Sequence, residues 1–86
     1  MYRIEYSRGA QKTLVRMQAN MARLIRSKIE QLAVDPFAAN NNVKRLRGMD
    51  AFRLRVGDWR VVYELHHRTV VIFVIRIGHR SSVYED

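Results

Sequence analysis

The sequence predicts an α+β fold in which two helices cover one face of a twisted sheet. Apolar residues recur at helical spacing between about residues 8 and 35, and they alternate at strand spacing on both sides of that stretch. The 86-residue chain is 48% apolar and has no cysteine. These numbers predict one small domain, residues 1–86, with a packed core and no disulfide or thiol chemistry.

The N-terminal half is predicted to be a strand followed by a helical hairpin. Tyr2–Tyr6 alternates as a half-buried strand does, and Ser7 is a suitable N-cap for the next helix. Asn20 is expected to end or interrupt that helix, and Asp35-Pro36 is expected to stop the second one. The two apolar stripes are Ala10, Leu14, Met17 and Met21, then Met21, Ile25, Ile29 and Leu32.

The C-terminal half is predicted to be an antiparallel meander. Turn signals at Gly57-Asp58 and His66-His67-Arg68 separate its strands, and Gly78 is expected to end the last long one. That strand is rich in β-branched residues, which is typical of a central strand covered on both faces. The expected strands are Val43–Arg47, Ala51–Val56, Trp59–Leu65 and Thr69–Ile77, with a short strand or tail at Ser81–Tyr84.

Positive charge is the first indication of function. Lys and Arg number 16 against 8 Asp and Glu, which gives a net charge of +8. Most of the cations are arginines, whose planar forks bind phosphate and stack on bases. Such a balance points to nucleic acid, an acidic protein or an anionic membrane. Because no signal peptide or membrane-length apolar run is apparent, we expect a cytoplasmic protein with no membrane partner.

Several arginines are expected to share one face of the sheet. If the apolar residues of 52–56 face the helices, Arg53 and Arg55 point to the other side. An antiparallel sheet can leave one face solvated, so this face is predicted to be a phosphate-binding surface. The neighbouring strands, or the residues just past them, add Arg60, Arg76 and Arg80.

Three segments resemble the RelE/ParE superfamily of bacterial and archaeal toxins, and the upstream strand and helices fit it too. The segments are Lys44-Arg45-Leu46-Arg47-Gly48, residues 52–64 from Phe52-Arg53-Leu54-Arg55 to Arg60-Val61-Val62-Tyr63-Glu64, and Gly78-His79-Arg80-Ser81-Ser82-Val83-Tyr84. The resemblance implies a toxin of a type II toxin–antitoxin module with a microbial-RNase-like fold. RelE-type members cleave messenger RNA in the ribosomal A site, whereas ParE-type members share the fold and poison DNA gyrase.

The resemblance also implies site residues, position by position. The paired basic residues after the Leu-Arg-Gly turn match Arg53 and Arg55, where the best-studied pattern has lysines. The arginine that opens the Arg-Val-Val-Tyr strand matches Arg60. The arginine after the late glycine and the C-terminal tyrosine match Arg80 and Tyr84. Further cations expected to bind RNA are Lys44, Arg45, Arg47 and Arg76.

Metal-free RNA cleavage needs a base for the 2′-hydroxyl, a cation for the phosphorane and an acid for the leaving 5′-oxygen. Arg60 and Arg80 suit phosphate clamping, although each could instead be a surface arginine or pair with Glu64 or Asp58. Arg53 and Arg55 remain protonated, so they are poor bases and are assigned positioning and electrostatic stabilisation.

His79 and Glu64 are the candidates for acid or base. Histidine as a residue type can exchange a proton near neutral pH. Strand alternation would nevertheless put His79 on the face opposite Arg80, and Glu64 could equally pair with an arginine. Tyr84 either stacks on a substrate base or packs on the sheet edge. We expect Trp59 and Tyr63 to be packing residues. No metal or cofactor is predicted, because no ligand set accompanies the turn histidines His66 and His67.

The leading hypothesis is therefore a metal-free endoribonuclease toxin acting on ribosome-bound messenger RNA. Its expected partners are a cognate antitoxin in a hetero-oligomer, mRNA and the 70S ribosome. A gyrase poison on the same fold and a non-enzymatic basic nucleic-acid-binding domain are the alternatives.

Overall fold

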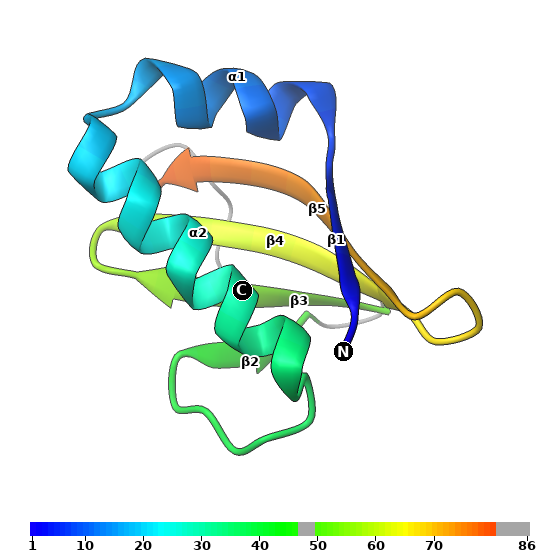
Figure 1. The fold of residues 1–86 in the computed structure, drawn as a ribbon. Helices are drawn as coiled ribbons and strands as arrows, with labels where there is room; N and C mark the ends of the chain where they lie inside the picture. Colours follow the sequence, from blue (N-terminus) through cyan, green and yellow to red (C-terminus); the bar gives the residue numbers. More distant parts are fainter. Residues whose placement is uncertain (47–49, 81–86) are drawn as a thin grey trace.

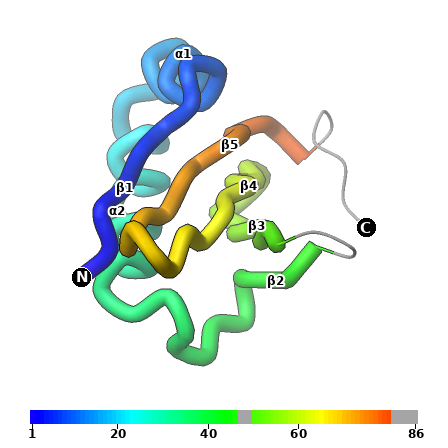
Figure 2. The backbone as a smooth tube through the Cα atoms, turned by 90° about the vertical axis from the view of Figure 1, so that its right-hand side faces the viewer, coloured from blue at the N-terminus to red at the C-terminus, as the bar shows by residue number. Residues whose placement is uncertain are grey.

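A five-stranded mixed sheet with both helices on one side forms the fold (Figures 1 and 2). This computed structural model describes residues 1–46 and 50–80. The elements in chain order are β1 (Arg3–Tyr6), α1 (Arg8–Arg16), α2 (Ala19–Val34), β2 (Val43–Arg45), β3 (Ala51–Val56), β4 (Trp59–His66) and β5 (Val71–His79). The predicted α+β fold, with a strand and a helical hairpin before the meander, is confirmed.

The strand order across the sheet is β1-β5-β4-β3-β2. Strands β2 to β5 pair antiparallel with their neighbours, as the meander predicts. Strand β1 pairs parallel with β5, with Arg3 opposite Val71 and Tyr6 opposite Val74. Because β1 stops at Tyr6, the last five residues of β5 extend past the end of their neighbour. This overhang lies beside α1 (Figure 1).

Ser7 caps α1, as predicted, and also ties it to the sheet. Its Oγ accepts a hydrogen bond from the Ala10 N–H at 3.1 Å and donates one to the Ile75 carbonyl at 2.6 Å. The predicted helix break at Asn20 is wrong. Helix α1 ends at Arg16, and Asn20 lies in the first turn of α2. Asparagine is tolerated there because the Met21 N–H, which has no helical acceptor, donates to its side-chain oxygen.

The apolar core lies between the helices and one face of the sheet. The apolar stripes of the helices supply Leu14, Ile25 and Ile29, all nearly or fully buried. Strand residues from the facing side of the sheet complete the core, among them Leu54, Val61, Tyr63, Ile72 and Val74. Helix α2 ends at Val34, immediately before the predicted stop at Asp35-Pro36.

Three strand predictions need correction. Strand β5 begins at Val71 rather than Thr69, because the preceding Val70 has a positive φ of 57° in the turn. It continues through Gly78, which pairs with Arg60, and ends at His79. It is also covered fully on one face only, since Arg76 is exposed on the other. Strand β2 ends at Arg45, and the predictions for Arg47 and Ser81–Tyr84 lie outside the described residues.

Within residues 1–46 and 50–80, neither helix is long and apolar enough to span a membrane.

Candidate nucleic-acid interface

Five cations lie on the face of the sheet opposite the helices. Residues paired across neighbouring strands point to the same face of a sheet, so the strand register shows which cations share a face. Arg53 lies between Lys44 and Val62, and Val62 lies next to Arg76. Arg55 lies opposite Arg60 in the next row. We call this surface the arginine face; it comprises Lys44, Arg53, Arg55, Arg60 and Arg76. Figure 2 shows both helices on the far side of the sheet from it.

Arg60 is the most buried cation of the arginine face. Only 7% of its surface is exposed, although it carries a full charge. Its Nη1 donates to the carbonyls of Gly57 at 3.0 Å and Trp59 at 3.1 Å. A positive φ of 58° at Gly57 shapes the tight turn that directs the first carbonyl toward the guanidinium. These bonds hold the Nη1 end of the Arg60 guanidinium against the main chain of the turn.

The two arginines of β3 differ in their surroundings. Arg53 is half-buried, and its Nε is buried. Arg55 is exposed and donates to the side-chain oxygen of Asn42 at 3.2 Å, next to a main-chain bond from its own N–H to the Asn42 carbonyl. No carboxylate is recorded against Arg55 among residues 1–46 and 50–80, so its charge remains available to an anion.

The acidic groups of the same face gather at its other end. Glu64 lies four residues along β4 from Arg60, about 13 Å away at the usual strand rise. Its carboxylate contacts the His66 Nε2 at 2.8 Å. Arg3 and Glu5 pair at 3.0 Å on β1. Glu64 and Arg60 therefore lie toward opposite ends of this face along β4, and a further carboxylate, Asp58, lies in the turn between β3 and β4.

Of the other predicted site residues, Arg80 lies at the end of the arginine face, just beyond the Arg60–Gly78 pair, and Arg45 lies on the opposite face. Arg80 follows β5, with its N–H bonded to the Asp58 carbonyl at 2.8 Å and its Nε 3.8 Å from the Asp58 carboxylate. Arg45 lies opposite Phe52, on the helix side of the sheet, and contacts Asp50 at 3.4 Å. Arg47 and Tyr84 lie outside the described residues, so their roles stay predictions.

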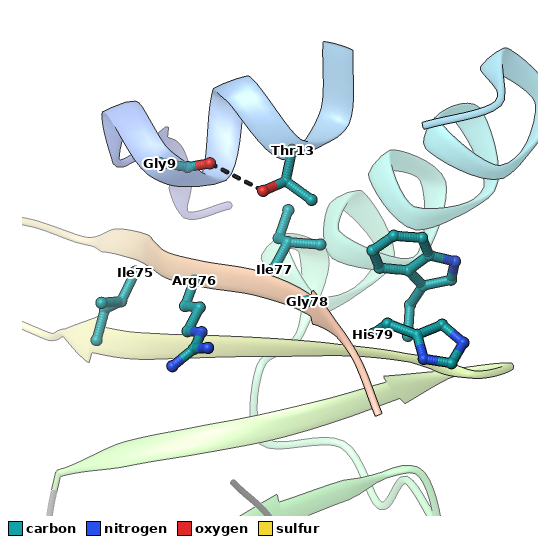
Figure 3. A pocket seen from close by; sticks show the side chains of 8 residues that line it. Gly9, Thr13, Ile75, Arg76, Ile77, Gly78 and His79 are labelled. Carbon is teal, nitrogen blue, oxygen red and sulfur yellow. Dashed lines mark hydrogen bonds between the residues drawn. The ribbon is translucent and has the colours of Figure 1, made fainter. Parts of the chain in front are cut away.

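His79 lies on the helix side of the sheet, and its ring contacts Trp59 edge to face. The centroids are 5.7 Å apart and the planes meet at 85°. Both rings line a cleft of about 450 Å³ between α1 and the overhang of β5 (Figure 3). Gly9 and Thr13 of α1 form its opposite wall. Sequence reasoning did not identify this cleft, since the only signal is a pair of small residues one turn apart.

In the part of the chain that the structure describes, no group of three or more acidic, histidine or cysteine residues could hold a metal ion.

A family model and a curated relative both match this chain over nearly its whole length. Residues 4–84 match the family described as the ParE toxin of type II toxin-antitoxin system, parDE. The chain is also 24% identical over 87 residues to the mRNA interferase toxin RelE of Escherichia coli K12, covering 99% of this chain and 92% of the relative.

Solved structures with the same fold include toxins from three organisms. The archaeal RelE–RelB complex of Pyrococcus horikoshii gives a TM-score of 0.81 at 24% identity, with 95% of this chain and 98% of that one covered. The intact E. coli RelBE toxin–antitoxin complex gives 0.78 at 24%, covering 92% and 96%. The YoeB/ParE toxin of Agrobacterium tumefaciens gives 0.77 at 19%, covering 90% and 96%. With the family match over nearly the whole sequence, the chain belongs to the RelE/ParE superfamily and is a toxin of a type II toxin–antitoxin system.

Proposed function

We propose that this toxin is an endoribonuclease that cleaves messenger RNA in the ribosomal A site. The observation that carries the proposal is the arginine face, with a buried, fixed guanidinium at Arg60 and further cations in the adjoining rows. Its curated relative in E. coli is named an mRNA interferase, which supports the same activity.

The chemistry requires a pentacoordinate phosphorane to be stabilised. The 2′-oxygen attacks phosphorus, the bond from phosphorus to the 5′-oxygen breaks, and the products are a 2′,3′-cyclic phosphate and a 5′-hydroxyl. The 2′-hydroxyl proton goes to a base, and an acid supplies a proton to the 5′-oxygen. We expect Arg60 to stabilise the charge on the phosphorane through the positive charge of its guanidinium, which the Nη1 bonds to the Gly57 and Trp59 carbonyls hold in place.

The remaining cations bind and position the RNA. Arg53 and Arg55 lie on β3, next to the strand that carries Arg60, and they contribute electrostatic stabilisation. Lys44 and Arg76 extend the positive surface to the neighbouring strands. Arg80 and Tyr84, which the family resemblance matches by position, keep the roles predicted from their chemistry, a second phosphate clamp and a ring for base stacking.

The proton transfers are not assigned to either of the predicted acid or base candidates. Glu64 is about 13 Å along β4 from Arg60, and His79 lies on the other side of the sheet. Neither side chain therefore reaches a phosphate held at Arg60. The guanidinium groups cannot act as bases at neutral pH, so their contribution is to lower the energy of the charged transition state.

An acidic antitoxin is the expected protein partner. Several structures of the same fold are toxin–antitoxin complexes. The net charge of +8 favours an acidic segment, and covering the arginine face would block access of RNA.

Gyrase poisoning is the second candidate, favoured by the ParE name of the matching family and by arginine at positions 53 and 55. Primer extension on a reporter message in a reconstituted translation system separates the two. The proposal predicts cuts within A-site codons that need ribosomes and disappear with Arg80→Ala. An intact message in cells arrested by the toxin, with gyrase trapped on DNA, would overturn it.

A further inference from the structure

The cleft between α1 and the overhang of β5 is separate from the arginine face. It lies on the helix side of the sheet, beyond the point where Tyr6 and Val74 end the pairing of β1 with β5. Its volume of about 450 Å³ falls in the range of small-ligand sites. Trp59 and His79, whose rings contact each other, line the cleft. Thr13 lines it from α1 (Figure 3).

We propose that this cleft binds one unpaired base of a single-stranded RNA. The inference rests on the proposed function in taking RNA as the ligand. Aromatic side chains beside polar groups are the usual receptor for an unstacked base. Here the ring of Trp59 supplies the stacking surface, with the His79 ring at right angles to it. Thr13 donates its hydroxyl to the Gly9 carbonyl at 3.1 Å, so its oxygen lone pairs can accept from a base amino group.

The main chain of β5 adds further polar groups to the cleft. Along an edge strand, alternate N–H and C=O groups point away from the neighbouring strand. In residues 76–79 that direction leads into the cleft, since β1 covers only the earlier part of β5 and Ser7 already donates to the Ile75 carbonyl. Main-chain groups of this kind can read the hydrogen-bonding edge of a base.

The charges around the cleft favour a phosphate-linked ligand. Arg76 lines the cleft through its main chain, while its guanidinium points away from α1 toward the arginine face (Figure 3). Arg80 follows directly after His79. None of the eight described residues that line the cleft is acidic. An RNA strand on the arginine face could thus pass the end of β5, keep its phosphates near these two arginines and insert one base into the cleft.

Trp59 is the only tryptophan in the chain, so tryptophan fluorescence reports on a ring that lines this cleft. The test titrates the purified toxin with a 2′-O-methyl RNA trinucleotide, which cannot undergo 2′-oxygen attack, and with an abasic trinucleotide of the same charge. We expect the trinucleotide with bases to quench Trp59 and the abasic one to leave it unchanged. Equal quenching by both would overturn the inference, because phosphate alone would then explain the signal.

Gly9→Leu is the blocking variant. A Cβ at Gly9 would meet no atom within 4 Å, so the position has open space for the start of a side chain, and leucine replaces a glycine inside a helix. Gln11→Leu, on the exposed side of the same helix, is the matched control. We expect Gly9→Leu to weaken trinucleotide binding about ten-fold and Gln11→Leu to leave it unchanged. Unaltered binding by Gly9→Leu would overturn the inference.

A second readout separates this inference from the proposed function. If the wild-type toxin cuts the message but the trinucleotide quenches Gly9→Leu as strongly as wild type, the base site in the cleft is overturned and the proposed ribonuclease is not. If the wild-type toxin does not cut the message, but its base-dependent quenching is lost in Gly9→Leu, the proposed ribonuclease is overturned. That result would still support base binding in the cleft. If Gly9→Leu instead weakens binding of the cognate antitoxin and leaves trinucleotide binding intact, the cleft docks protein and the inference fails.

Discussion

The two faces of the sheet differ sharply although they alternate along the same strands. On β3, Leu54 and Val56 are buried against the helices, whereas Arg53 and Arg55, one residue away, carry charge on the opposite face. The helix side holds the apolar core, and the other side has no described helix over it (Figure 2). The comparison teaches that one short segment can stabilise the fold and bind an anion, because side-chain direction reverses at each residue.

The difference predicts that substitutions separate into two classes. Changes on the arginine face should alter activity with the fold retained. Changes on the helix side should alter the free energy of unfolding.

The largest effect is expected at Arg60. Arg60→Ala removes the fixed guanidinium and should lower the rate of message cutting on ribosomes by about 10²–10³-fold, the usual cost of losing one oriented donor to a developing anion. Arg60→Lys keeps the charge without the fork and should fall between Ala and wild type. Single-turnover primer extension measures the rate, and circular dichroism checks the fold. Wild-type cutting by a folded Arg60→Ala variant would contradict this role.

A core substitution on α2 should act on stability instead. Ile29 is fully buried, so Ile29→Ala should lower the free energy of unfolding by about 2–5 kcal/mol. Leu24 is 43% exposed on the same helix, and Leu24→Ala should cost less than about 1 kcal/mol. Urea unfolding followed by circular dichroism measures both. Equal losses would mean that the helix does not pack as described.

Alkaline pH should weaken the fold through Tyr63. Burial raises the pKa of this hydroxyl from 10.0 to about 12. Between these values the unfolded chain releases the proton and the folded chain keeps it, so stability falls as the pH rises from 10 to 12. The loss should be on the order of 2 kcal/mol. Tyr63→Phe should flatten the decline, which urea unfolding at pH 9 and 12 can measure; an unchanged decline would exclude Tyr63 as its source.

A smaller effect is expected at the start of α1. Ser7→Ala removes the cap to the Ala10 N–H and the bond to the Ile75 carbonyl, and should cost about 1–2 kcal/mol. Ser27→Ala, at an exposed position of α2, should change stability by less than about 0.5 kcal/mol. Thermal unfolding of the two variants side by side tests the difference, and a Ser7→Ala melt that matches wild type would remove the cap from the account.

Local patterns were sufficient to predict most of the fold. Alternation and helical spacing identified the strands, the helices and the arginines that share a face, because both depend only on side-chain direction. The extension of β5 through Gly78 depended on its pairing with Arg60 of β4. The position of the helix break was not marked by the apolar spacing, which runs on through Met17 and Met21. The parallel pairing of β1 with β5 also required the folded chain, since no local signal fixes which edge β1 joins.

The candidate site was predictable only in part. The family resemblance identified Arg53, Arg55 and Arg60, and the register brings them together. The burial of Arg60 and its carbonyl partners could not be foreseen, because they arise from the Gly57 turn. Glu64 was a reasonable base by residue type, but its place four residues along β4 separates it from Arg60.

Two charge-matched double variants test the central claim most directly. Arg55→Ala with Arg76→Ala removes two exposed cations from the arginine face, and Arg16→Ala with Arg23→Ala removes two exposed cations from the helices. The measurement is the rate of A-site cutting of a reporter message. The account predicts a loss of about 100-fold for the first pair, from two charged contacts to phosphate, and a change within about two-fold for the second. Equal losses in the two pairs would show that net charge, not the arginine face, drives the activity, and would contradict the account.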